Sequence, residues 1–228
     1  MTKYDVFLFD ADGTLFDYDM AEAAALKAMF DYCGFCYTEN VRFIYREINS
    51  RVWEKFEKGE ITKIELQTLR FEKLFAEIGV SYDAGLFNEK YLAELGKGSF
   101  LIDGAAEICN HIFSNDKRIY IVTNGILATQ KARIEHSLIK AFISGFFVSE
   151  FIGFQKPHIS YFEYVFSHIP QCDKSKMIII GDSITADIAG GSRAGIDSCW
   201  FNSTGEVNDS DVVPTYEIKR LSELREFV

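Results

Sequence analysis

The chain has 228 residues, of which 48% are hydrophobic, 25% charged and 15% aromatic. This composition supports a large buried core and excludes a disordered or collagen-like chain. Lys and Arg number 24 against 34 Asp and Glu, and the resulting net charge of -10 disfavours a polyphosphate partner such as nucleic acid. An acidic protein can still bind one small phosphate where a metal ion and a lysine reverse the local charge.

The first ten residues already contain Asp5 and Asp10, too early for a signal peptide, and no later apolar run approaches ~18 residues. The 5 cysteines are an odd number, and without a secretory signal we expect them to be reduced rather than bridged. We therefore expect a soluble cytoplasmic protein with no membrane partner.

Short apolar runs rich in β-forming residues are typical of buried strands. Runs of this kind lie at 4–9, 118–123, 145–148, 176–181 and 198–201. Helix-like stretches lie between them in the second half of the chain, at 104–115, 126–141, 158–168 and 185–194. Near-continuous apolar strands alternating with helices predict an α/β fold, a Rossmann-like doubly wound parallel sheet covered on both faces.

Residues 17–98 show no strand-like run. The apolar positions from Val41 to Phe56 recur at helical intervals, and Thr62 with Glu65 forms a capping box that opens a further helix. We therefore expect a core domain at 1–16 and 99–228 with an inserted all-helical cap domain at 17–98. Both ends of this insertion lie near the loop after the first strand, a suitable place for a lid.

Polar side chains follow several of the predicted strands at the edge where open α/β sheets bind ligands. Asp10 and Asp12 follow the first strand, and Asp182 follows the fourth. Two carboxylates two residues apart and a third from a distant strand are the ligand set that Mg²⁺ uses when it also keeps waters and a substrate phosphate. Lys156 in the loop after the third strand adds a positive charge. This constellation indicates a phosphoryl substrate.

Four short motifs resemble, in order and position, those of the haloacid dehalogenase (HAD) superfamily phosphatases. They are Asp-Ala-Asp-Gly-Thr-Leu at 10–15, Val-Thr-Asn-Gly at 122–125, Lys-Pro at 156–157 and Gly-Asp-Ser-Ile-Thr-Ala-Asp at 181–187. A finer similarity is to the YjjG-type pyrimidine 5'-nucleotidases. It rests on Trp53 and on the segments 9–12, 59–62, 66–67, 69–71, 133–135 and 199–202.

The resemblance implies that Asp10 is a nucleophile and forms an aspartyl-phosphate that water then hydrolyses. It implies that Asp12 protonates the leaving group and later activates the water, so that the two carboxyl groups need different protonation states. It further implies that Mg²⁺ binds the side chains of Asp10 and Asp182 and only the backbone carbonyl of Asp12.

The resemblance also implies which groups hold the transferring phosphoryl oxygens: Thr123, the backbone N–H of Asn124, and Lys156. Asp187 would orient Lys156 or a metal-bound water. A purely structural role for Asp187 stays equally open, because an acid in the first turn of a helix is favoured by the helix dipole.

Taken together, the resemblance implies a Mg²⁺-dependent phosphomonoesterase whose partner is a small phosphorylated metabolite, best a pyrimidine or deoxypyrimidine nucleoside 5'-monophosphate. The alternative is a phosphoglycolate or sugar-phosphate phosphatase of the same superfamily, and a phosphomutase also stays open. Dehalogenation is disfavoured because a halide leaving group needs no general acid such as Asp12. The sequence leaves the oligomeric state open.

Two further classes remain, a non-catalytic binding module on this fold and a redox protein that uses the C-x-x-C pair Cys33 and Cys36. The complete set of carboxylates and lysine argues against the first class. Against the second, a thioredoxin-like site opens a helix after a strand, whereas this pair ends a helical stretch with Gly34 as a C-cap.

Overall fold

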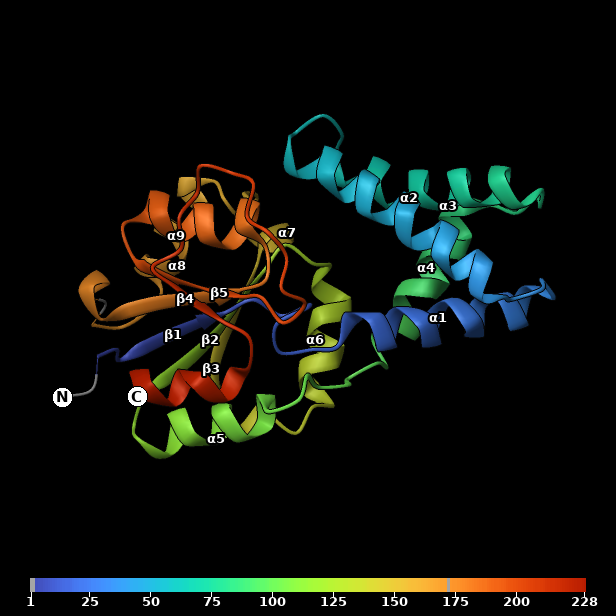
Figure 1. Cartoon of the computed structure of the whole chain (residues 1–228). Coiled ribbons are helices and arrows are strands. Elements are labelled where there is room, and N and C mark those ends of the chain that lie inside the picture. The colour runs from blue at the N-terminus through green and yellow to red at the C-terminus, as the bar shows by residue number, and fades with distance from the viewer. Residues whose placement is uncertain (1–2, 172) are drawn as a thin grey trace. The chain divides into compact units, whose positions relative to one another are not determined.

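The computed structural model describes residues 3–171 and 173–228. The chain forms two compact units, one made of the segment up to Tyr18 together with Ser99–Val228, the other of Asp19–Gly98. Figure 1 labels the helices and strands of both units. No helix in the described part of the chain is both long and apolar enough to cross a membrane.

The first unit is built on a six-stranded parallel sheet with the order β3-β2-β1-β4-β5-β6 (Figure 1). The strands are β1 Val6–Phe9, β2 Arg118–Thr123, β3 Ile143–Val148, β4 Met177–Gly181, β5 Asp197–Phe201 and β6 Tyr216–Ile218. Strand β1 pairs with β2 on one side and β4 on the other, so the winding direction reverses beside it. Such a reversal opens the crevice in which doubly wound sheets bind ligands. The predicted fold class is confirmed.

Helices cover both faces of this sheet, as alternation of the strand side chains requires. They are α5 Ala105–Ser114, α6 Leu127–Glu135, α7 Ser149–Ile152, α8 Ile159–Ser167 and α9 Ala189–Ala194. Phe7 and Phe9 of β1 pack in one cluster with α5, and Val6 and Leu8 pack in the opposite cluster with α8. Every residue of β1 is buried, which fixes the position of the loop that follows it.

One strand and the segment between α6 and β3 differ from the sequence prediction. Strand β6 was not predicted, because three residues with Glu217 in the middle give no apolar run. Helix α6 ends at Glu135, well short of 141, because the chain turns at Ser137, whose hydroxyl accepts a hydrogen bond from the Ile139 N–H at 3.3 Å. A short 3₁₀ turn then leads into β3, which begins at Ile143, two residues before the predicted start.

The second unit is helical throughout its regular structure: α1 Tyr18–Cys33, α2 Glu39–Glu57, α3 Lys63–Ile78 and α4 Ala84–Leu95. The predicted capping box is confirmed, because the Thr62 hydroxyl accepts from the Glu65 N–H while the Glu65 carboxylate accepts from the Thr62 N–H. Aromatic side chains form much of the core, with Phe71 stacked on Tyr45 at a centroid distance of 5.4 Å.

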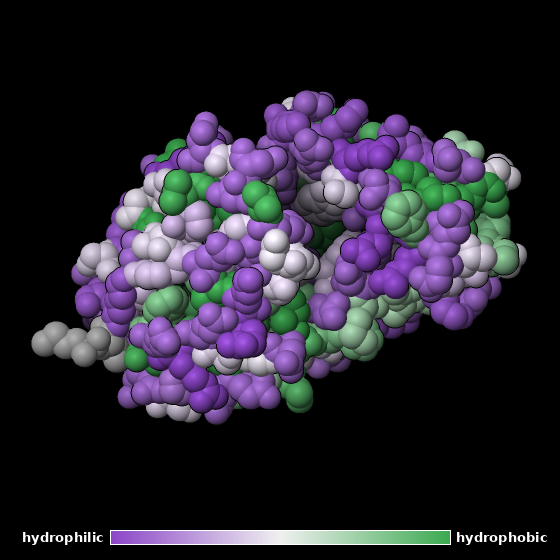
Figure 2. Space-filling model, viewed as in Figure 1, coloured by the Kyte–Doolittle hydropathy of each residue, from purple (hydrophilic) through white to green (hydrophobic). Residues whose placement is uncertain are grey.

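The C-x-x-C pair lies at the end of a helix, as predicted. Helix α1 ends at Cys33, and Gly34 follows with a φ of +71°, the left-handed conformation that favours glycine at a helix end. Cys33, Cys36, Cys109 and Cys199 are free thiols, and the expectation of a reduced Cys172 lies outside the described residues. The face drawn in Figure 2 is mostly hydrophilic with scattered hydrophobic residues, as expected for a chain of this charge.

Buried polar side chains gather inside the helical unit. Arg70 of α3 is 2% exposed and donates to Asn49 of α2 at 3.3 Å and to Asn88 of α4 at 2.8 Å. Glu22 of α1 is also 2% exposed. Burial raises the pKa of Glu22 to about 7 against the opposing charge of Arg46, so the folded unit favours the neutral acid over the carboxylate.

We predict that this carboxyl group makes the helical unit less stable as the pH rises. The pKa of Glu22 is about 7 in the folded state and near 4.5 when exposed, so its stabilising contribution is complete below pH 4.5 and is lost as the pH rises to 7. The loss is at most about 3.5 kcal/mol, since one pKa unit is worth about 1.4 kcal/mol. In Glu22→Gln, thermal unfolding between pH 5 and pH 8 should show a smaller decline than in the wild type. The exposed Glu72→Gln is the control, and parallel curves for Glu22→Gln and wild type would refute the burial argument.

Candidate active site

A buried lysine holds two carboxylates together at the carboxyl edge of the sheet. The Lys156 Nζ lies 2.6 Å from Asp10 Oδ1 and 2.6 Å from Asp187 Oδ1, and it also donates to the Val122 carbonyl at 2.8 Å. The backbone of Lys156 is fixed as well, because the Asn124 amide accepts from its N–H at 2.8 Å and donates to its carbonyl at 2.9 Å. The lysine is thus anchored both at its backbone and at its ammonium group.

The strand order brings these groups to one edge. Asp10 follows β1, and its N–H donates to the Ile180 carbonyl of the neighbouring β4 at 2.8 Å, while Asp182 follows β4. Gly13 allows the two loops to approach closely. It has a φ of +78°, and a Cβ atom there would lie 2.3 Å from Asp182 Oδ2. A side chain at position 13 would therefore displace the Asp182 carboxylate.

The electrostatics of the site are those of crowded carboxylates around one cation. Burial raises the pKa of Asp10 well above its usual value, Lys156 opposes this rise, and Asp187 and Asp182 add to it. Asp182 is more exposed than the other two acids, and crowding by protein atoms and the Asp187 carboxylate raise its pKa above the usual value. Burial alone would lower the pKa of Lys156, but Asp10 and Asp187 raise it above its ordinary value. The lysine therefore stays charged, and a further cation would favour ionisation of the acids.

Three of the carboxylates fit a metal ion. Asp10, Asp182 and Asp187 each bring one oxygen to within 4.8 Å of the others, and hard carboxylate oxygens are the donors that Mg²⁺ prefers. The sequence assigned only the first two of these as side-chain ligands. The geometry adds Asp187, which is 1% exposed and which also accepts from the Ser183 N–H at 3.2 Å. An acid that only interacted with the dipole at the start of a helix would not need this contact with Lys156.

The two polar residues at the end of β2 serve the loop itself in this structure. Thr123 is 2% exposed, and its hydroxyl accepts from the Gly125 N–H at 3.0 Å. The side chain of Asn124 is used to fix Lys156. Both residues lie at the same edge of the sheet as Asp10, because β2 is the parallel neighbour of β1.

Asp12 has partners that the sequence prediction did not include. Arg133 of α6 donates to its Oδ1, and Gln130 of the same helix donates to its Oδ2 at 2.5 Å. Arg133 is fully buried, with its guanidinium 4.7 Å from the centroid of the Phe16 ring. The available signal was the spacing of Gln130 and Arg133, which places two polar residues on one face of a helix beside the motif at 122–125.

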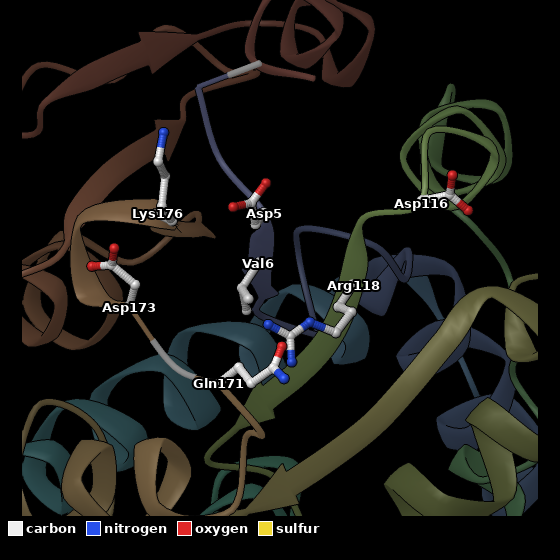
Figure 3. Close-up of a pocket in the computed structure, with 7 residues that line it drawn as sticks. All are labelled: Asp5, Val6, Asp116, Arg118, Gln171, Asp173 and Lys176. Carbon is white, nitrogen blue, oxygen red and sulfur yellow. The ribbon is translucent and has the colours of Figure 1, made fainter. Parts of the chain in front are cut away.

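A separate pocket of about 350 Å³ lies at the opposite edge of the sheet (Figure 3). Its lining includes the first residues of β1 and β2, Val6 and Arg118, and Lys176 just before β4. Ligands of open α/β sheets bind at the carboxyl ends of the strands, and this pocket is at the amino ends. Its lining mixes the acids Asp5 and Asp173 with the basic residues Arg118 and Lys176, which is not a catalytic constellation.

Comparisons with known proteins decide the family. The model of the haloacid dehalogenase-like hydrolases matches residues 4–195. YfnB of Bacillus subtilis (strain 168), which carries the name of a HAD-hydrolase, is 42% identical over 98% of this chain and 95% of its own length. The chain belongs to the haloacid dehalogenase-like hydrolases. All four motif segments at the carboxyl edge of this HAD chain lie within the matched residues.

Two relatives of this HAD hydrolase carry names that specify a reaction. The pyrimidine 5'-nucleotidase PynA of Streptococcus pneumoniae is 34% identical over 97% of this chain and 93% of its own length. The pyrimidine 5'-nucleotidase YjjG of Escherichia coli is 30% identical over 99% and 98%. The crystal structure of B. subtilis YfnB, described as bound to magnesium with interdomain movement, superposes with a TM-score of 0.94 over 98% of both chains.

We predict that Lys156→Met destabilises the HAD fold near neutral pH. It would leave the buried Asp10 and Asp187 side by side without a positive charge, and breaking a buried ion pair by removing one partner costs about 3–5 kcal/mol. Chemical unfolding at pH 7.5 with EDTA should show this loss, whereas the exposed Lys73→Met should stay within about 0.5 kcal/mol of wild type. An unfolding free energy of Lys156→Met equal to that of wild type would mean that the lysine contributes no net stability.

Proposed function

We propose that this HAD hydrolase is a Mg²⁺-dependent phosphomonoesterase that acts on a nucleoside 5'-monophosphate, with pyrimidine and deoxypyrimidine forms preferred. The observation that carries the proposal is the Lys156 ammonium bound between Asp10 and Asp187 at the carboxyl ends of the strands. A charged donor fixed beside a carboxylate suits a transferring group that bears negative oxygens.

In the proposed reaction the Asp10 carboxylate attacks phosphorus, and the bond between phosphorus and the ester oxygen breaks. Asp12 gives a proton to the departing alkoxide, which leaves as the alcohol. A water molecule then loses a proton to Asp12 and attacks the same phosphorus, which releases phosphate and restores Asp10. Lys156, Thr123 and the backbone N–H of Asn124 would stabilise the negative charge on the phosphoryl oxygens.

Asp10 and Asp182 would hold Mg²⁺ through their side chains, Asp12 through its backbone carbonyl, and Asp187 is near enough to bind it or a water molecule on it. When bound, the ion supplies positive charge that neutralises the substrate phosphate and favours the ionised form of Asp10. The magnesium named for the structure of YfnB, 42% identical to this chain, supports this proposal.

The helical unit would act as a cap that selects the substrate, because the motifs account only for phosphate chemistry. Several aromatic residues of the unit are buried in its core, among them Phe56, Phe71, Phe75 and Phe87. Trp53 is only partly buried, with its ring 5.7 Å from that of Phe56. Trp53 is therefore our candidate for stacking on a base. The pyrimidine 5'-nucleotidase names of PynA and YjjG support the choice of base.

We predict the substrate order in a panel of phosphomonoesters assayed with Mg²⁺: dUMP, dTMP, UMP, AMP, phosphoglycolate and glucose 6-phosphate. A pyrimidine monophosphate should exceed phosphoglycolate in kcat/KM by at least ~10-fold, because a base stacked on an aromatic ring is worth ~1–3 kcal/mol. Trp53→Ala should reduce that preference and spare hydrolysis of p-nitrophenyl phosphate, with Phe43→Ala, an exposed aromatic of the same helix, as the matched control. Phosphoglycolate or the hexose phosphate at the head of the panel would replace the nucleotidase proposal by the alternative.

We also predict that activity depends on a divalent cation. Few protein ligands would hold the ion, so EDTA should abolish phosphate release and Mg²⁺ should restore it. Asp182→Asn should raise the Mg²⁺ concentration needed for half-maximal activity, while Asp173→Asn, an acid remote from the described carboxyl edge, should leave it unchanged. Activity that persists after exhaustive chelation would contradict the proposed metal site.

A further inference from the structure

The carboxylate of Asp12 is held by two side chains of α6. Arg133 Nη1 donates to Oδ1, and Gln130 Nε2 donates to Oδ2 at 2.5 Å. Each oxygen of the carboxylate thus has its own donor, which fixes the rotation of the group as well as its position. Hydrogen bonds that involve an ionised partner are the strongest of their kind, and those from a planar guanidinium are directional.

Both donors are themselves fixed. Arg133 is 0% exposed and lies with its guanidinium 4.7 Å from the centroid of the Phe16 ring, four residues beyond Asp12. Gln130 is 2% exposed, and a Cβ atom at Gly125 would lie 2.4 Å from its Nε2. The glycine of the segment 122–125 therefore leaves the room that the amide needs to reach Asp12.

The Gln130 amide has no other role in view. Within residues 3–171 and 173–228 its Oε1 is buried and has no hydrogen-bond partner. A buried polar atom without a partner costs free energy, so a glutamine at this position would destabilise the core if its amide made no hydrogen bond. The hydrogen bond from Gln130 Nε2 to Asp12 is the favourable interaction that this side chain makes at its position.

We propose that Arg133 and Gln130 are positioning residues that orient Asp12 for proton transfer, and that turnover of unactivated alkyl esters, such as nucleoside monophosphates, depends on them. This inference rests on the proposed phosphatase function. A ribose alkoxide is a strong base and needs a proton from a carboxyl group held within hydrogen-bond reach, whereas an aryl oxide leaves without one. The water that completes the cycle needs the same oriented group for either ester.

A double-mutant cycle tests the proposal, because a residue that acts only through Asp12 loses its effect once Asp12 is disabled. The four proteins are wild type, Arg133→Met, Asp12→Asn and the double variant, compared in steady-state turnover of p-nitrophenyl phosphate and, for the first two, of dUMP. We expect Arg133→Met to lower kcat for dUMP at least ~10-fold with KM changed less than ~3-fold, a share of the ~10²–10⁴-fold that acid–base catalysis contributes. For p-nitrophenyl phosphate, on which the cycle is closed, Arg133→Met should slow steady-state turnover at least ~3-fold in the wild-type background and less than ~2-fold in the Asp12→Asn background.

Controls separate positioning from folding. Lys131→Met removes an exposed positive charge from the same helix and should leave kcat unchanged. Arg133→Lys should recover part of the lost kcat, because it restores the charge without the planar fork. Gln130→Met, a change of similar size, should lower kcat for dUMP by at least ~3-fold, and it carries the test if circular dichroism shows that Arg133→Met does not fold.

The rate of product release in the first turnover, compared with the steady-state rate, distinguishes a positioning role from a merely structural one. With p-nitrophenyl phosphate, release of the first p-nitrophenol should be nearly unchanged in Arg133→Met, while the later steady state slows. An equal cost of Arg133→Met with and without the Asp12 carboxylate, or equal slowing of burst and steady state, would overturn the positioning role. If the wild type releases no phosphate from either ester, the proposed function itself fails, and this inference fails with it.

Discussion

One buried cation organises the carboxyl edge of this sheet. Lys156 is 2% exposed and lies 2.6 Å from both Asp10 and Asp187, two acids that follow different strands, β1 and β4, and that would otherwise repel each other. A charge is costly to bury unless it is paired, so the ammonium and the two carboxylates must be assembled together. The loops after β1 and β4 and the loop that carries Lys156 are therefore tied to a single arrangement.

The same constraint accounts for the chemistry that we propose. Beside these groups a third acid, Asp182, gives the site more negative charge than one lysine can balance. Such a site favours protonated acids when it is alone and ionised acids when a divalent cation is bound. Asp12 differs from this group, because its carboxylate is held by Arg133 and Gln130 rather than by the lysine. The proposed division into a metal-binding set and a separately held proton carrier corresponds to which side chains contact each acid.

The sequence predicted the fold and the edge of the sheet at which the candidate residues lie, because both depend on local patterns. The buried strands are continuous apolar runs, and each is followed at once by its polar residues, as at Asp10 and Asp182. The three-residue strand β6 and the early end of α6 were not predicted, since neither has a periodicity long enough to detect. The spacing of Gln130 and Arg133 marks a polar face of a helix, but it does not identify Asp12, 118 and 121 residues away, as the partner of that face. For Asp187, the family resemblance implied a place beside Lys156 or a metal-bound water, while the local sequence fitted a helix-start acid equally well, and the structure places it 2.6 Å from Lys156 Nζ.

The central claim is that Asp10 attacks phosphorus, and trapping the covalent intermediate tests it most directly. The enzyme is mixed with p-nitrophenyl phosphate and Mg²⁺, quenched in acid within the first turnover and reduced with borohydride, which converts an aspartyl-phosphate to homoserine. Peptide mass spectrometry should then find homoserine at position 10, with Asp12 unchanged. Phosphate release without any modified residue, or modification at another acid, would contradict the account.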